Sequence, residues 1–201
     1  MFSILQAAGW PIWPLLLTSI LSVTLIIERA GTLRRNKIVP PGLLQSVVAD
    51  FRKSGATDEM LKRLDKHSPL GRVFAAGLGN VKSSREVMKE AIEESGRGVA
   101  HELERFLTSL GTIASISPLM GLFGTVVGMI EIFGSPTASG NNPQALAHGI
   151  SVALYNTGFG LIIAIPSMIF YRHFRALVDS LVIEMELQAV KLVELVHGER
   201  S

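Results

Sequence analysis

The chain of 201 residues contains no cysteine, and only 6% of its residues are aromatic. Without cysteine it can form neither a disulfide framework nor a thiolate metal site. It also lacks a nucleophile–base motif, a Walker loop and a dinucleotide fingerprint. We therefore expect no enzymatic activity and no cofactor.

Uncharged apolar sequence, in contrast, is abundant. Hydrophobic residues make up 48% of the chain, and the runs 10–27, 106–130 and 149–170 contain no Lys, Arg, Asp or Glu. Each run is long enough to cross a hydrocarbon core of roughly 30 Å as a helix. The sequence therefore predicts an all-α membrane protein with three transmembrane helices and long cytoplasmic helical extensions.

The positive charges predict the orientation of these spans. Of the 19 Lys and Arg residues, fifteen lie between residues 29 and 105 and four between residues 172 and 200. By the positive-inside rule these segments are cytoplasmic. The expected order is an outer, periplasmic N-terminus (1–9), a first span (10–28), a cytoplasmic helical domain (29–105), a second span (106–133), a periplasmic loop (134–148), a third span (149–171) and a cytoplasmic C-terminal helix (172–201). The expected surroundings are a lipid bilayer and not nucleic acid.

The first span is expected to remain in the mature protein. No basic region precedes it, and Glu28 and Arg29 follow it where a signal peptide would have a cleavage site.

The insertion at 38–105 is too long for a simple loop and is expected to contain helices. Breaks are predicted at 40–42 and 67–69, and Thr57 is expected to cap a short helix. Ser83 and Glu86 fit a capping box that would start a long helix. Because no strong stop follows, one helix of roughly 50 residues is expected to continue through the second span.

Residues 172–196 are expected to extend the third span as an amphipathic helix. Its apolar stripe needs a cover, which either the insertion or a neighbouring subunit would supply.

Small and hydroxyl-bearing residues recur at steps of three and four in two of the spans. In the second span they are Gly111, Ser115, Pro118, Gly121, Thr125 and Gly128, and in the third they are Ala153, Thr157, Gly160, Ala164 and Ser167. Gly124 and Gly128 also form a GxxxG pattern. Two such faces on antiparallel helices would pair closely or line a shared lumen.

Two interpretations of Thr125 and Thr157 stay open at this point. A membrane threonine commonly bonds a carbonyl of its own helix or joins a helix pair, but it can also line a polar path. The interiors of the spans contain no ionisable residue, and Glu131 and His148 lie only at their ends. A proton path would therefore need a carboxylate from a partner.

Metal binding is not expected. His101, Glu102 and Glu104 lie on a charged helix face, and no second histidine follows His101 at i+4.

The stretches LGTIASISPLMGLFGTVVGMI, at 110–130, and GISVALYNTGFGLIIAIP, at 149–166, resemble the ExbB/TolQ/MotA proton-channel family, nearest to ExbB and TolQ. The resemblance implies a pentamer in the inner membrane whose second and third spans line a pore. Single spans of an ExbD- or TolR-like partner would occupy that pore and contribute a membrane aspartate.

The resemblance also assigns residues. Thr125 and Thr157 match pore threonines that face the partner's aspartate, whereas Val152 stands where ExbB and TolQ members carry a glutamate. The residues expected to pack the helices at the pore are Gly121, Gly124, Gly128, Gly160, Pro118 and Pro166.

The implied function is a proton-channel or stator subunit that couples the proton motive force to work at the outer membrane or envelope, with a TonB- or TolA-like protein as a further partner. The alternative is a non-conducting membrane scaffold whose cytoplasmic helices form a docking platform.

Overall fold

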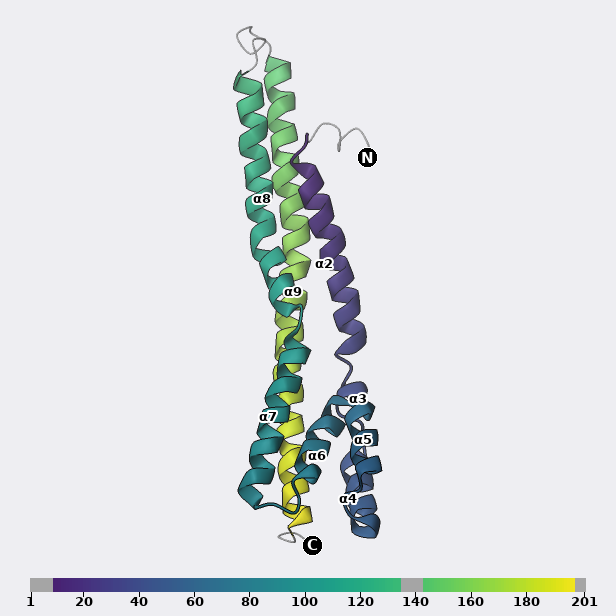
Figure 1. Cartoon of the computed structure of the whole chain (residues 1–201). Helices are drawn as coiled ribbons and strands as arrows, with labels where there is room; N and C mark the ends of the chain where they lie inside the picture. The colour runs from purple at the N-terminus through teal and green to yellow at the C-terminus, as the bar shows by residue number, and fades with distance from the viewer. Residues whose placement is uncertain (1–8, 135–142, 198–201) are drawn as a thin grey trace. The chain divides into compact units, whose positions relative to one another are not determined.

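The computed structural model describes residues 9–134 and 143–197, and these residues form helices and no strand. The helices are α2 (Ile12–Thr32), α3 (Arg35–Ile38), α4 (Leu43–Ser54), α5 (Asp58–His67), α6 (Pro69–Gly79), α7 (Arg85–Glu104), α8 (Leu107–Gly134) and α9 (Pro143–Val196) (Figure 1). The predicted all-α fold is confirmed. Most of the expected outer segments at 1–9 and 134–148 lies outside the described residues.

The chain divides into two compact units. The span unit consists of residues 1–28 and 106–173, and the insertion unit consists of residues 29–105 and 174–201. In the described residues, three helices are long and apolar enough to cross a membrane, as judged by length and composition: α2, α8 and α9. The predicted continuation of the third span is confirmed, since α9 runs without interruption from Pro143 to Val196.

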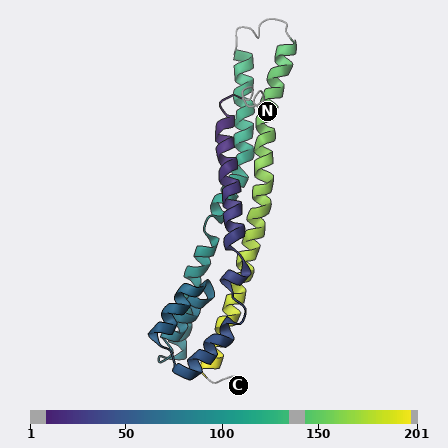
Figure 2. The same cartoon turned by 90° about the vertical axis from the view of Figure 1, so that its right-hand side faces the viewer.

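In the span unit, α2 lies beside both α8 and α9, as Figures 1 and 2 show from two sides. The ring of Trp10, just before α2, meets the ring of Phe123 on α8 edge to face, with centroids 6.1 Å apart. The hydroxyls of Ser22 on α2 and Ser167 on α9 are hydrogen-bonded at 2.6 Å, and both residues are buried. A buried hydrogen bond between spans favours one fixed register of α2 on α9.

Turn residues shape the insertion unit largely as predicted. The break at 40–42 is confirmed, with Gly42 at a φ of 77° immediately before α4. The Thr57 hydroxyl accepts from the Met60 N–H and caps α5, which confirms the predicted cap. At the predicted turn of 67–69, Ser68 ends α5 and caps α6, whose first residue is Pro69. A proline costs little there because the first helical N–H has no intrahelical partner.

The core of the insertion unit forms around α6 and the second half of α9. Phe74 and Leu78 on α6 are fully buried. The predicted stripe of α9 contributes buried Phe174, Leu181 and Leu192 to the same unit. The apolar stripe of α9 is thus covered by the insertion of the same chain, which was one of the two covers expected from the sequence.

The predicted capping box is wrong by one residue. The N-cap of α7 is Ser84, whose hydroxyl accepts from the Val87 N–H, and not Ser83. The carboxylate of Glu86 accepts from its own backbone N–H and from the Ser84 hydroxyl, which lowers the pKa of Glu86. A carboxylate in the first turn also complements the helix dipole.

The single helix predicted from residue 83 through the second span is also wrong. Helix α7 ends at Glu104, Phe106 has a φ of 64°, and α8 starts at Leu107. No glycine or proline marks this break. Other donors satisfy the last carbonyls of α7: Arg29 donates to the Leu103 oxygen at 3.2 Å, and the Arg105 N–H to the Glu102 oxygen at 3.2 Å.

Candidate functional site

Glycines bring the backbones of α8 and α9 into direct contact. A Cβ atom placed on Gly160 would lie 2.5 Å from the carbonyl oxygen of Ser117. On Gly121 it would lie 2.7 Å from the carbonyl oxygen of Asn156 and 2.9 Å from the Cα of Thr157. Because these neighbours are backbone atoms, a larger residue at either glycine would force the helices apart.

The contact extends along both helices in antiparallel order. A Cβ on Gly128 would meet the side chain of Ala153 at 3.5 Å, and one on Gly111 would meet the ring of Tyr171 at 3.1 Å. Four glycines predicted to pack at the pore, Gly121, Gly124, Gly128 and Gly160, therefore lie in the α8–α9 contact. Their position beside a pore stays a prediction.

Asn156 is a central member of this contact that the sequence interpretation missed. Its side chain is only 1% exposed, and a Cβ on Gly124 would lie 2.7 Å from its Cβ and 2.8 Å from its Cγ. The spacing could have revealed it, because Asn156 follows Ala153 by three residues and precedes Gly160 by four. The contact thus contains a buried carboxamide next to Thr157.

The two candidate threonines are half-exposed. The hydroxyl of Thr125 donates to the carbonyl oxygen of Leu122 at 2.6 Å. Gly121 lies one helical turn from Thr125 and touches the backbone of Thr157. The two threonines are therefore about one turn apart along the helix pair.

Pro118 and Pro166 lie inside α8 and α9 without ending them. Pro118 is half-exposed and Pro166 is exposed, and Ser115 of the predicted small face is exposed as well. Each proline removes one backbone donor from its helix. Their expected place at a pore stays a prediction.

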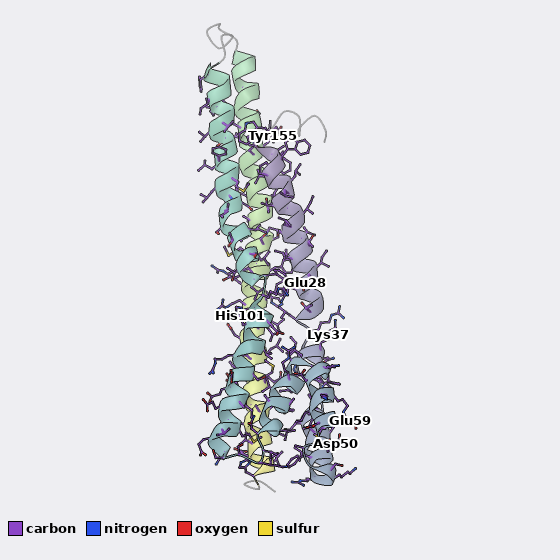
Figure 3. The ribbon with its side chains drawn as sticks, viewed as in Figure 1. Glu28, Lys37, Asp50, Glu59, His101 and Tyr155 are labelled. Carbon is purple, nitrogen blue, oxygen red and sulfur yellow. The ribbon has the colours of Figure 1, made fainter. Side chains whose placement is uncertain are left out.

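Charged groups near the spans contribute little to this site. The described residues contain no cluster of His, Cys, Asp and Glu that could hold a metal ion, and His101 is exposed on α7 (Figure 3). The side chains of Glu131, His148 and Val152 lie outside the described part of the structure.

Three apolar helices, two of them packed through glycine around hydroxyl and carboxamide groups, define a multi-span membrane protein. The model of the MotA/TolQ/ExbB proton channel family matches residues 65–187. The chain belongs to this family. It is an ExbB/TolQ-like energising subunit, a transport component and a multi-pass protein of the inner membrane.

Individual relatives agree with this assignment. The chain is 34% identical over 179 residues to a Synechocystis protein named biopolymer transport protein ExbB-like 3, covering 86% of this chain and 83% of the relative. It is 32% identical to the biopolymer transport protein exbB1 of Vibrio cholerae, covering 81% and 74%. It is 29% identical to the Tol-Pal system protein TolQ of Pseudomonas aeruginosa, covering 90% and 86%.

Proposed function

We propose that protons cross the membrane beside Thr125 and Thr157, between a ring of five copies of this chain and the single span of an ExbD- or TolR-like partner. The main support for this proposal is the glycine-packed contact between α8 and α9. In this contact both threonines are half-exposed and lie about one turn apart. Half-exposed hydroxyls at a rigid contact suit a polar path that a second molecule completes.

The partner is needed for its carboxylate. The runs 10–27, 106–130 and 149–170 contain no charged residue. A proton path through a bilayer normally uses an ionisable side chain at depth. An aspartate in the partner's span, placed opposite the threonines, would supply that group.

Proton movement would then drive mechanical work. Each charge that crosses releases about 2.3 kcal/mol per 100 mV of membrane potential. Neutralising and recharging the partner's aspartate would shift the partner inside the ring, and a TonB- or TolA-like protein would carry the work to the outer membrane or envelope. The N-terminus would be periplasmic and the C-terminus cytoplasmic, because all 19 Lys and Arg residues lie in the segments assigned to the cytoplasm.

One observation favours a second candidate, a non-conducting scaffold. The hydroxyl of Thr125 already bonds a carbonyl of its own helix. This is the usual arrangement of a threonine whose role is structural. In that case the small residues would serve packing alone.

Proton flux into proteoliposomes distinguishes the two candidates. We expect Thr125→Val and Thr157→Val to lower the flux of the co-purified complex at least tenfold while its assembly is kept, and the corresponding serine variants to conduct. Thr112→Val is the matched control, because the Thr112 hydroxyl also bonds its own helix, donating to the Thr108 oxygen at 2.9 Å. A complex of the original protein that conducts no more than empty liposomes would support the scaffold, whereas equal conduction in all these variants would refute the role of the threonines.

A further inference from the structure

The insertion unit contains a groove between α7 and the second half of α9. Its volume is about 630 Å³, and Val73 of α6 contributes to its lining. The apolar lining residues are Val73, Ile92, Ala100, Val182, Met185, Ala189, Val190 and Val193. A groove between two helices with such a lining suits the apolar face of a third helix.

The α7 rim of this groove is mainly positive. Arg85, Lys89 and Arg97 line it together with one acidic residue of the same helix, Glu93. Lys89 and Arg97 are exposed. An occupant with acidic residues beside its apolar face would complement this rim.

A matching surface lies on α9 itself. Ile183, Leu187 and Val190 form an outer stripe at i, i+4 and i+7, and they are 57%, 58% and 55% exposed. The buried side chains of this helix, Phe174, Leu181 and Leu192, lie on the opposite face at helical spacing. A row of exposed large apolar residues on a charged helix marks an interaction site.

The flanks of the outer stripe are mainly acidic. Asp179 precedes Ile183 by one helical turn, and Glu194 follows Val190 by one turn. Glu186 lies between Ile183 and Leu187 and also lines the groove of its own copy. Lys191 is the one basic residue between positions 179 and 194. The stripe therefore has the charge that the α7 rim favours.

We propose that the outer stripe of α9 docks into the α7–α9 groove of the next copy of this chain. Ile183 and Leu187 do not line the groove of their own copy, so a second copy is needed to bring the two surfaces together. Val190 lies at the edge that stripe and groove share, whereas Ile183 and Leu187 lie only on the stripe, so the contact joins two different surfaces head to tail. Repeated, such a contact gives a ring when the rotation between neighbours closes. It rests on the ring of the proposed function but not on its proton path.

The absence of cysteine makes a disulfide cross-linking test clean. Two differently tagged copies, one with Ile92→Cys and one with Leu187→Cys, are co-expressed with the partner and oxidised in membranes. We expect a disulfide-linked product that contains both tags. The matched control replaces Ile92→Cys with Glu90→Cys, which is exposed on α7 but outside the groove lining, and should give little product.

Charge reversal sharpens the test. Lys89→Glu together with Arg97→Glu should lower the cross-linking yield on the order of tenfold, because acidic flanks would then face an acidic rim. An intact oligomer by native mass spectrometry without the mixed product would overturn the docking and leave the ring standing. A monomer would overturn both ring and docking, whereas the threonine variants test the proton path separately.

Discussion

At the scale of single residues, glycine is required where a Cβ would overlap a neighbouring atom and optional where the space is open. Gly121 faces the Asn156 oxygen and the Thr157 Cα, whereas a Cβ on Gly158 would have no neighbour within 4 Å. Overpacking typically costs about 1–3 kcal/mol. We expect Gly121→Ala to lower the thermal stability of the detergent-solubilised protein and its proton flux, and Gly158→Ala to leave the melting temperature unchanged or higher. Equal melting of the two variants would contradict this account.

Gly124 and Asn156 form a pair that can be exchanged. A Cβ on Gly124 would overlap the Asn156 side chain, so Gly124→Ala should destabilise the protein. Adding Asn156→Gly removes the atoms that clash, and the double variant should recover part of the loss despite its second helical glycine. Melting curves of both single variants and the double variant give the coupling between Gly124 and Asn156, as the difference between the effect of the double variant and the sum of the single effects. A purely additive result would mean that the two residues do not touch.

Sequence patterns predicted the small residues of the site better than its polar member. Gly121, Gly128 and Gly160 could be found because three- and four-residue spacing directly reports a shared helix face. Asn156 was missed because a large amide does not belong to the small-residue class that defined the pattern. Only the structure shows that Gly124, which has no side chain, leaves the space that the Asn156 side chain occupies.

At the scale of elements, the break between α7 and α8 depends on contacts distant in sequence. Residues 85–130 read as one helix locally, but the chain turns at Phe106 with a φ of 64°. The guanidinium of Arg29, only 5% exposed, donates to the Leu103 oxygen near the end of α7. Local propensity could not predict a cap from a residue more than seventy positions away. The turns at Thr57 and Ser68 were predictable because their caps come from residues next to the helix in sequence.

Replacing this cap should loosen the end of α7. A hydrogen bond to a charged group contributes about 1.5–3 kcal/mol. We expect Arg29→Met to increase amide hydrogen exchange in the peptide around Leu103, with less change at the start of α7 near Ser84. Arg29→Lys, which keeps the charge, should fall between this variant and the original. If amide exchange around Leu103 is the same in all three proteins, Arg29 does not cap the helix.

The ion pair between α3 and α9 predicts a pH dependence. Arg35 donates to both carboxylate oxygens of Glu184, through Nε at 2.9 Å and through Nη2, and holds the pKa of Glu184 below its ordinary value of 4.5. A lowered pKa in the fold means that the pair stabilises above the ordinary pKa and is lost as the pH falls below it. The melting temperature of Glu184→Gln should therefore be slightly lower than that of the original at neutral pH, and the difference should vanish in acid. Glu90→Gln, exposed on α7, is the control.

At the scale of the whole molecule, the distribution of charge and of apolar length predicts one orientation. Fifteen of the 19 Lys and Arg residues lie between 29 and 105, and none lies between 106 and 171. Three candidate spans and a basic segment after the first would place the loop at 134–148 outside. A reporter that is active only outside the cytoplasm should work when fused after residue 140 and fail when fused after residue 59. A cytoplasmic reporter at the same two positions should give the opposite pattern, and an inverted result would place the threonine site on a helix pair of the wrong polarity for the proposed coupling.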